Sequence, residues 1–307
     1  MSRHGFRITG VLLVTGGVLL GSVGGAGLAQ ADPVIPPVLA ELFSSGSAAL
    51  GSIDPVAPDA PRLASIDNFR DVAGIGVGYA GADGKNVNKG VFYRSNVIVP
   101  NEADLATLTG LGLSTAYDLR SDEEVAKKPD VLPAGVTYMH LPIGAGDYTT
   151  VLSHIKSVDD SRAFMQEMNR LFVTGENERT QFGAMLTDMA TTTGPAVFHC
   201  SGGKDRTGWT SYLLLSIAGV DAQTIMNDYL LTNEYTKDSI AANLATLQSY
   251  FGDAAANMAP LVSVEPNFLQ AGIDQLTADY GTVESYLTEG LGLNLDIIGE
   301  LKDKLLR

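Results

Sequence analysis

The sequence predicts an α/β fold in which a mainly parallel sheet is flanked by helices and followed by further helices. Short β-rich segments alternate with helical patterns from residue 65 onward, and the chain after Gly219 is mostly helical. Alternating strands and helices are typical of parallel sheets, because two parallel strands need a crossover connection between them. Apolar residues make up 45% of the 307 residues, which is enough for a packed core.

Four segments have the composition of strands, with β-branched and aromatic residues between turn-forming residues. They are Gly90–Arg94, Leu113–Leu119, Val136–Leu141 and Pro195–His199. The last segment follows a Gly-Pro turn and has the apolar sequence of a buried strand. We expect these four segments to form the parallel part of the sheet.

The helices are indicated by apolar residues at helical spacing and by capping residues. Asn101 and the acids after it open a helix, and a long helical region from Ser161 to Met189 is expected to break at Gly175. The apolar segment Trp209–Ala218 is followed by Gly219, which suits the position after a helix end. Further helices are predicted over Asp221–Asn233, Ser239–Phe251, Asn267–Tyr280, Val283–Glu289 and Leu295–Leu306.

The last predicted helix has an apolar face. Its residues Leu295, Ile298, Leu301 and Leu305 recur at helical spacing. We expect this face to pack on the core, with a helix lying on a membrane surface as the alternative.

The first 31 residues have the three parts of a secretory signal peptide. Two arginines precede an apolar run from Ile8 to Leu20, and Ala29-Gln-Ala31 is a small-residue cleavage sequence. A membrane anchor is the alternative, but seven glycines interrupt the uncharged stretch, and its strongly apolar part has only 13 residues. We therefore expect export with cleavage after Ala31. The mature chain would have no integral membrane segment and would be secreted or kept in the cell envelope.

The net charge limits the expected partners, and the proline content indicates the domain organisation. The chain has 35 acidic and 20 basic residues, a net charge of −15. Nucleic acid is not an expected partner, because phosphate backbones are bound by clustered positive charge. Residues 32–64 hold six of the 13 prolines and should form an irregular lead-in, with a weak helix at Val38–Leu50. Residues 65–307 form the predicted main domain.

The one cysteine of the chain, Cys200, follows the predicted strand that ends at His199. Five residues separate it from Arg206, near the beginning of the next helix. Such a loop directs successive backbone N–H groups into one concavity, beside the positive end of a helix. Gly202 and Gly203 permit the positive φ angles that the loop needs, and Arg206 has a planar fork that matches phosphate oxygens.

This loop predicts phosphoryl transfer. Helix N-termini and nearby cations favour the thiolate form of cysteine, so Cys200 should be ionised at neutral pH and able to attack phosphorus. An inert buried thiol is the alternative, but the sequence after Cys200 favours a nucleophile. A nucleotide-binding P-loop does not fit, because Lys204 is followed by Asp205 and not by Ser or Thr.

The segment His199-Cys-x5-Arg-Thr-Gly208 is similar to the signature of the cysteine-dependent tyrosine and lipid phosphatases, and its Gly-Lys-Asp-Arg form resembles a bacterial branch with secreted mycobacterial members. Further segments resemble elements of that branch in the same order: Asn68–Asp71, Tyr93–Ser95, Asp118–Ser121 and Asp228–Leu230. Ala73 stands where the family usually has a second glycine. The resemblance covers residues from Ser65 to the C-terminus. It implies the cysteine-phosphatase fold, without cofactor or metal.

The resemblance also implies roles for the loop residues. Cys200 would become phosphocysteine, and Arg206 would bind phosphate and stabilise the transition state. Backbone N–H groups of Ser201 through Asp205 would bind the substrate. Thr207 would donate its hydroxyl to the departing sulfur, and Lys204 would add a second positive charge, which in similar loops accompanies lipid or inositol phosphate substrates.

The motif leaves more than one candidate for the general acid. The Trp-Pro-Asp sequence that many relatives use is absent from the chain. The resemblance suggests Asp205, whose pKa nearby phosphate and thiolate would raise and neighbouring cations would lower. Asp118 and Asp147 are second candidates. His199 is expected to support the loop by a hydrogen bond, and Asp118 is counted among the supporting residues.

Other ionisable residues have two interpretations each. The run Asp122–Glu124 could hold a metal ion, but a solvated helix start is expected. His140 and His154 have no motif around them and should be structural. Arg70 and Arg120 could line the site or form salt bridges.

The sequence therefore predicts a metal-independent phosphomonoesterase that acts through a phosphocysteine intermediate on phosphotyrosine proteins, phosphoinositide lipids or both. One alternative is a non-catalytic protein that binds phosphorylated ligands through the same loop. Another is a sulfur-transfer or arsenate-reducing enzyme, but arsenate reduction usually needs resolving thiols, and this chain has none.

Overall fold

A computed structural model of the chain describes residues 59–144 and 154–306. The predicted signal peptide, the predicted helix at Val38–Leu50 and most of the lead-in lie outside these residues. The described residues begin shortly before the predicted main domain and contain the whole Cys200 loop.

The described residues form a five-stranded sheet in the order β1-β2-β5-β3-β4. The strands are β1 (Arg70–Asp71), β2 (Phe92–Ser95), β3 (Thr115–Asp118), β4 (Thr137–His140) and β5 (Ala196–His199). Strands β2, β5, β3 and β4 run parallel, and β1 pairs antiparallel with β2. The predicted α/β fold with a mainly parallel sheet is confirmed. Strand β1 was not predicted, because two residues are too few to show an alternating pattern.

The helical elements alternate with the strands and then fill the C-terminal part of the chain. They are η1 (Ala82–Gly84), α2 (Glu102–Gly110), α3 (Asp122–Lys127), α5 (Val158–Thr174), α6 (Glu176–Thr191), α7 (Asp205–Ile217), α8 (Ala222–Tyr235), α9 (Lys237–Phe251), η2 (Gly252–Met258), α10 (Ala259–Val262), α11 (Pro266–Tyr280), α12 (Val283–Ser285), η3 (Tyr286–Gly290) and α13 (Leu295–Leu305).

Capping residues set most of the helix limits that the sequence predicts. The Asn101 side chain accepts the N–H of Asp104 at the start of α2, and Gly175 separates α5 from α6 as expected. Gly219 has a φ of +72° after the end of α7, which fits its predicted place. Two regions differ from the prediction. The helix expected over 283–289 is divided into α12 and the π-turn η3, and residues 252–262 form η2 and α10, which were not predicted.

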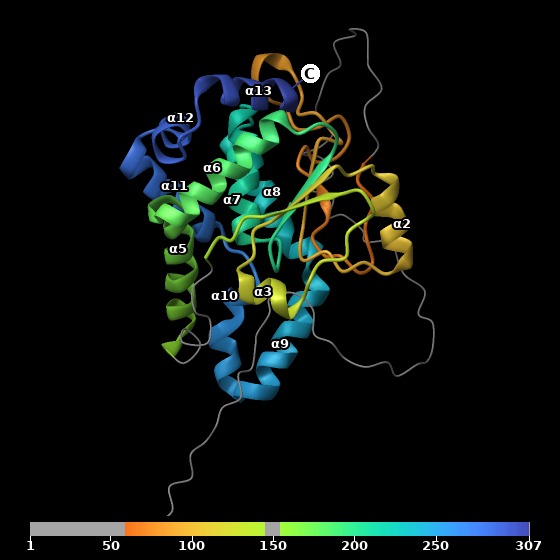
Figure 1. Ribbon diagram of the computed structural model, residues 1–307. Coiled ribbons are helices and arrows are strands. Elements are labelled where there is room, and N and C mark those ends of the chain that lie inside the picture. The colour runs from red at the N-terminus through yellow and green to blue at the C-terminus, as the bar shows by residue number, and fades with distance from the viewer. Residues whose placement is uncertain (1–58, 145–153, 307) are drawn as a thin grey trace, which may run out of the picture. The chain divides into compact units, whose positions relative to one another are not determined.

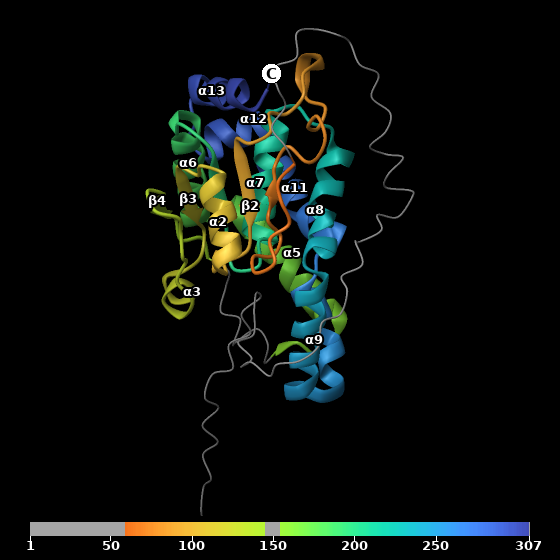
Figure 2. The same cartoon turned by 90° about the vertical axis from the view of Figure 1, so that its right-hand side faces the viewer.

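Side chains of successive residues point to opposite faces of the sheet and enter two separate cores. Tyr117 and Phe198 belong to the larger core, under α5, α6 and α7. Their neighbours Ala116 and Val197 belong to the smaller core, which includes Leu108 of α2. Figure 1 shows α2 on one side of the sheet and α5, α6 and α7 on the other, and Figure 2 shows α2 in front of the strands. Strand β5 is thus buried on both faces.

The topology places the end of β5 in the middle of the sheet. In the parallel register, His199 lies level with Ser95 of β2 and with Asp118 of β3. The carboxyl ends of parallel strands lie at one edge, where α/β proteins bind ligands. Residues that follow β2, β3 and β5 therefore meet around the Cys200 loop.

Helix α13 packs against α6 and α7. Leu301 and Leu305 are buried and Ile298 is half-buried, as predicted from their spacing. Leu295 was predicted on the same apolar face, but it is 65% exposed. It is the first residue of the helix, and only the later turns pack on the core.

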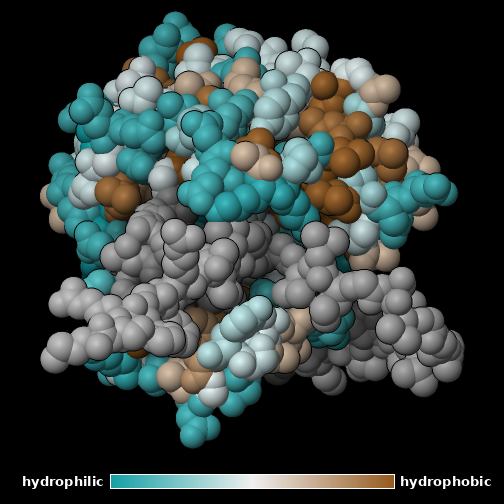
Figure 3. Space-filling model, turned by 60° about the horizontal axis from the view of Figure 1, so that its bottom comes forward, coloured by the Kyte–Doolittle hydropathy of each residue, from teal (hydrophilic) through white to brown (hydrophobic). Residues whose placement is uncertain are grey.

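Large apolar side chains are exposed at several separate places among the described residues. They are Ile75, Val77, Val131, Tyr138, Tyr250 and Leu295. On the face seen in Figure 3, the described surface is mainly hydrophilic, and the apolar side chains gather at the upper right. None of the described helices combines the length and the apolar character that a membrane span requires.

Candidate active site

The loop between β5 and α7 has the strand–loop–helix geometry that the sequence predicts. Cys200 is the first residue after β5 and is 2% exposed. Helix α7 begins at Asp205, so Arg206 and Thr207 lie in its first turn. The positive end of α7 therefore faces the loop that starts at Cys200.

Gly203 forms the tightest point of this loop. Its φ is +64°, and a Cβ atom there would lie 2.5 Å from the carbonyl oxygen of Ser95, so only glycine fits without displacement. The Gly203 carbonyl accepts hydrogen bonds from Asn68 Nδ2 at 2.6 Å and from Arg94 Nη2 at 2.9 Å. Two side chains from outside the loop therefore set the direction of this peptide.

Arg94 is in turn held by a buried acid. Asp228 Oδ2 accepts from Arg94 Nη1 at 3.0 Å, and Asp228 Oδ1 accepts from Arg70 Nε at 3.2 Å. Burial favours the neutral carboxyl, but Arg70 and Arg94 hold the pKa of Asp228 below its ordinary value. Burial also lowers the pKa of Arg94 to about 9. Of the two interpretations of Arg70, the structure supports the salt bridge.

Arg206 makes a bidentate contact with Glu124 of α3. Arg206 Nη1 lies 2.8 Å from Glu124 Oε2, and Nη2 lies 2.8 Å from Oε1. Nη1 also donates to the carbonyl oxygens of Leu119 at 3.0 Å and Ile143 at 3.2 Å. The guanidinium is therefore held in one orientation from three sides. Two parallel N–H···O bonds are the strongest form of this pair.

Glu124 corrects the prediction of a solvated acidic helix start. The side chains of Asp122 and Glu123 are 93% and 76% exposed, but that of Glu124 is only 22% exposed. Burial favours the neutral carboxyl, yet the nearby Arg206 lowers the pKa of Glu124 to about 2. Glu124 also closes a capping box with Ser121, a pattern that is visible in the sequence as Ser-x-x-Glu.

Ser201 and Thr207 flank the loop with hydroxyl groups. Ser201 Oγ donates to Glu124 Oε1 at 2.5 Å, and its carbonyl accepts the N–H of Val97 at 3.3 Å. Thr207 is fully buried, and its Oγ1 has no hydrogen-bond partner among the described residues. An unpaired buried hydroxyl in the first turn of α7 is able to donate to a group that gains charge during a reaction.

Asp205 is buried at the start of α7, with an exposed fraction of 5%. Burial raises the pKa of Asp205, and Lys204 and Arg206 oppose that rise. Its Oδ2 lies 3.5 Å from Lys204 Nζ, and its Oδ1 has no hydrogen-bond partner among the described residues. A carboxyl group in such surroundings keeps a proton at higher pH than a solvated one.

The Lys204 ammonium turns away from the loop. Nζ donates to the carbonyl oxygens of Leu261 at 2.7 Å and Ser263 at 3.1 Å, at the end of α10. The sequence predicts Lys204 among the substrate-binding residues, and in this structure its charge is engaged by α10.

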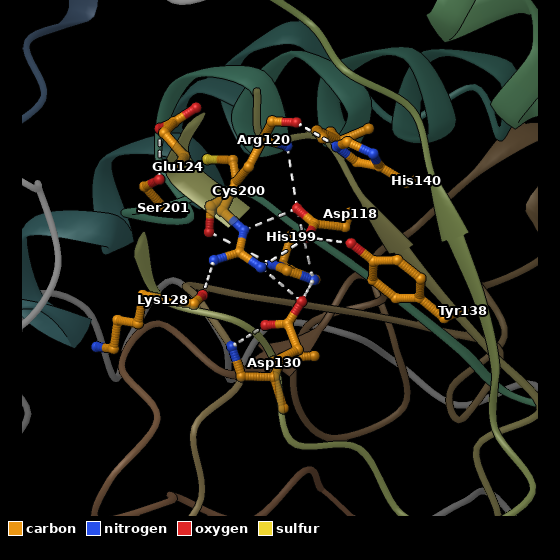
Figure 4. A network of polar contacts seen from close by, with 12 residues as sticks. Asp118, Arg120, Glu124, Lys128, Asp130, Tyr138, His140, His199, Cys200 and Ser201 are labelled. Carbon is orange, nitrogen blue, oxygen red and sulfur yellow. Dashed lines mark hydrogen bonds and ion pairs between the residues drawn. The ribbon is translucent and has the colours of Figure 1, made fainter. Parts of the chain in front are cut away.

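Behind the loop, a buried polar network joins the ends of β3 and β5. Figure 4 shows the Arg120 guanidinium between two carboxylates. Arg120 Nη2 lies 2.6 Å from Asp118 Oδ2 and 2.7 Å from Asp130 Oδ2, so Arg120 forms salt bridges. His199 Nε2 lies 3.2 Å from Asp130 Oδ2, and its Nδ1 lies 3.5 Å from the carbonyl oxygen of Cys200. Tyr138 donates to Asp118 Oδ2 at 2.8 Å.

This network makes Asp118 unsuitable as the general acid. Burial opposes ionisation of Asp118, but His199 and Arg120 hold its pKa well below the ordinary value. Its carboxylate is therefore ionised at neutral pH and has no proton to give. Asp147, the other second candidate, lies outside the described residues.

One group of the described residues has the composition of a metal site. Ligand atoms of Asp118, Asp130 and His199 all lie within 4.8 Å of one another. The Arg120 guanidinium already bonds both carboxylates, and a divalent cation there would be repelled by it. We therefore assign these residues to a salt-bridged network. His140 joins its edge through Nε2, 2.8 Å from the carbonyl oxygen of Arg120, which fits a structural role.

A small pocket lies beside the loop. Its wall is formed by residues from before β1, after β2, the loop, α9 and α10: Asp67, Asn96, Gly202, Lys204, Thr236, Ser239, Ile240, Asn243 and Val262. Asn96 is 6% exposed, and its Oδ1 has no hydrogen-bond partner among the described residues. Hydroxyl and amide groups thus surround one side of the loop.

The sequence profile of the tyrosine phosphatase family matches residues 61–307. The chain belongs to this family. A Cupriavidus necator protein that carries the name tyrosine-protein phosphatase is 31% identical over 256 residues, which are 78% of this chain and 91% of that protein. The resemblance seen in the sequence is therefore confirmed.

Two further relatives belong to other bacteria. The triple specificity protein phosphatase PtpB of Mycobacterium tuberculosis is 25% identical over 278 residues, covering 78% of this chain and 96% of that protein. A tyrosine-protein phosphatase of Nostoc commune is 27% identical over 214 residues, covering 66% and 70%. The crystal structure of P. aeruginosa TpbA is matched over 55% of this chain and 84% of that chain, at 22% identity and a TM-score of 0.27.

Three residues that support the loop have no predicted role of their own. Glu124 is predicted only as part of a solvated acidic run, although its capping box with Ser121 is a usable signal. Asn68 belongs to the Asn-Phe-Arg-Asp segment, but the sequence predicts no separate role for it. Its φ of +60° is known only from the structure. Asp130 has no local pattern at all, because its partners come from three distant segments.

Proposed function

We propose that the chain is a phosphomonoester hydrolase whose nucleophile is Cys200. The observation that carries this proposal is the placement of the one cysteine at the start of a loop that closes on the N-terminus of α7 and on Arg206. Backbone N–H groups of Ser201 to Asp205 and the Arg206 guanidinium supply the positive field that the equatorial oxygens of a transferring phosphoryl group need.

In the first step, Cys200 Sγ attacks phosphorus, an S–P bond forms, and the bond from phosphorus to the leaving oxygen breaks. Asp205 donates its proton to that oxygen, which leaves as an alcohol or phenol. In the second step, a water oxygen attacks phosphorus, the S–P bond breaks, and Asp205 takes the proton of the water. The Thr207 hydroxyl donates a hydrogen bond to the departing sulfur.

Asp205 is the acid that the surroundings favour. Its burial raises its pKa, and Oδ1 is unpaired among the described residues. Glu124, the other carboxylate beside the loop, has a pKa of about 2 and is bonded to Arg206. A group that must give a proton near neutral pH needs the environment of Asp205.

We further propose phosphotyrosine proteins, phosphoinositides or both as substrates, and export after cleavage at Ala31. Two relatives carry the name tyrosine-protein phosphatase, and a third carries the name triple specificity protein phosphatase. The hydroxyl and amide groups of the pocket beside the loop support a substrate with further polar groups. A panel of phosphopeptides and phosphoinositides, assayed side by side, separates the two classes.

Turnover of p-nitrophenyl phosphate tests the reaction. We expect turnover that persists in a metal chelator and is lost in Cys200→Ser. Stoichiometric phosphate binding without turnover would instead support the non-catalytic alternative. Full activity of Cys200→Ser would refute the proposed nucleophile.

A leaving-group series tests the acid. Asp205→Asn should slow aryl phosphates with poor leaving groups much more than those with good ones, because only the former need protonation. Equal slowing across the series would remove Asp205 as the acid.

A further inference from the structure

Asp130, which lies between α3 and β4, makes contacts that reach three distant segments. Its side chain is 3% exposed. Oδ1 accepts the backbone N–H of Ile98 at 2.8 Å, and Oδ2 accepts from Arg120 Nη2 at 2.7 Å. Oδ2 also lies 3.2 Å from His199 Nε2. Figure 4 shows Asp130 beside Arg120 and His199. One carboxylate thus bonds two segments and lies against a third.

The three partners belong to three neighbouring parallel strands. Ile98 follows β2, Arg120 follows β3, and His199 is the last residue of β5, which lies between the other two. The backbone adds a second link, because the Val131 N–H donates to the carbonyl oxygen of Ile98 at 2.8 Å. The carboxylate of Asp130 therefore lies across the strand ends from which the Cys200 loop departs.

His199 transmits this contact to the nucleophile. It directly precedes Cys200 and is fully buried, and its Nδ1 lies 3.5 Å from the carbonyl oxygen of Cys200. Its Nε2 faces Asp130 at 3.2 Å and Asp118 at 4.0 Å. Nε2 makes no hydrogen bond with either carboxylate in this geometry. Asp130 and Asp118 therefore restrict where the ring can lie by close contact and not by a hydrogen bond.

We propose that Asp130 is a positioning residue for the reaction at Cys200. It joins the segments that follow β2 and β3 and packs against His199 at the end of β5, and it thereby sets the direction in which the thiolate points. This proposal rests on the proposed function, because it assigns Asp130 to the attack by Cys200. Asp130 is distant from the loop in the sequence. The contacts described above join it to Ile98, Arg120 and His199, and not to the Cys200 thiol or to Arg206.

The alternative is that Asp130 only stabilises the fold. A purely structural carboxylate would change the melting temperature but leave the reactivity of each folded molecule as it was. A positioning residue would also change the rate constant for alkylation of Cys200 by iodoacetamide and would lower kcat more than it raises KM. Because the chain has one cysteine, a single adduct mass reports on this thiol alone.

The experiment compares Asp130→Ala, Asp130→Asn and the control Asp188→Ala in the full chain. Asp188 is also a carboxylate that joins two elements, since its Oδ2 accepts from Tyr117 Oη at 2.7 Å and from Thr192 Oγ1 at 3.0 Å. It lies near the end of α6, before the amino end of β5, away from the Cys200 loop. Each variant is measured for kcat and KM with p-nitrophenyl phosphate, for alkylation at pH 6 and for melting temperature.

For Asp130→Ala we expect a decrease of about tenfold or more in kcat and in the alkylation rate constant of the folded protein. Asp130→Asn keeps an acceptor for Ile98 and should lose less. Asp188→Ala should stay within about twofold of the unaltered chain in both rates, while its melting temperature falls.

Unchanged kcat and alkylation in Asp130→Ala would overturn the proposal, as would equal losses in Asp188→Ala. If Asp130→Ala does not fold, Asp130→Asn decides by the same two rates, measured below its melting temperature. A failure of the proposed function is distinguishable, because it would show as absent turnover in the unaltered chain, whereas the alkylation comparison remains measurable.

Discussion

Both carboxylate oxygens of Glu124 in α3 accept hydrogen bonds from the Nη atoms of Arg206 in α7, at 2.8 Å each. The two residues lie on helices that are separated in the sequence by β4, α5, α6 and β5, and Ser201 donates to Glu124 from inside the loop. The side chain best suited to phosphate is thus oriented before any substrate arrives. Such preorganisation is the main means by which a site stabilises developing phosphoryl charge.

Glu124→Gln is expected to lower kcat for p-nitrophenyl phosphate by about 10- to 100-fold. The neutral amide loses one of the two charge-assisted bonds, so the Arg206 fork is held less firmly. Glu123→Gln is the matched control, because Glu123 is adjacent, 76% exposed and paired with Lys127. Equal activity of the two variants would contradict an orienting role for Glu124.

The stability conferred by Glu124 should depend on pH in a defined window. Its pKa falls from an ordinary 4.5 to about 2 in the folded chain. A lowered folded-state pKa means that the stabilisation is present above pH 4.5 and is lost as the pH falls toward 2. Urea unfolding at several pH values should therefore show the unaltered chain and Glu124→Gln converging on acidification. A difference in unfolding free energy that stays constant from pH 7 to pH 3 would speak against this pairing.

Gly203→Ala should impair catalysis. The positive φ costs a non-glycine residue about 1–2 kcal/mol, and the added Cβ would lie 2.5 Å from the Ser95 carbonyl oxygen. The loop must shift, so kcat should fall while most of the fold remains. Gly299→Ala is the control, since a Cβ in that turn of α13 meets open space. It should stabilise the chain by about 0.5–1 kcal/mol, as alanine does in helices, without changing kcat.

Asp228→Asn should destabilise the chain by about 3–5 kcal/mol in urea unfolding. The change leaves the buried guanidinium groups of Arg70 and Arg94 without a counter-charge. Activity should fall as well, because Arg94 also holds the Gly203 carbonyl. Asp238→Asn, an exposed change in the first turn of α9, serves as the control and should have little effect. A loss below about 1 kcal/mol would show that this buried pair is not needed.

The sequence was sufficient for the fold class and for the strand–loop–helix geometry around Cys200. Strand composition, capping residues such as Asn101 and the break at Gly175 are local signals, and each lies within a few residues of the feature that it predicts. The Cys200–Arg206 spacing is local in the same way, since one loop and one helix start contain all of its parts.

Tertiary structure alone decided which distant side chains hold that loop. Glu124 belongs to an acidic run whose members look alike in the sequence, and only the docking of α3 distinguishes it from Glu123. Lys204 and Asp118 could each have faced the substrate, but contacts with α10 and with Arg120 turn them elsewhere. The physical reason is that a buried charge must find a partner wherever packing brings one, and the order of residues along a chain does not specify that packing.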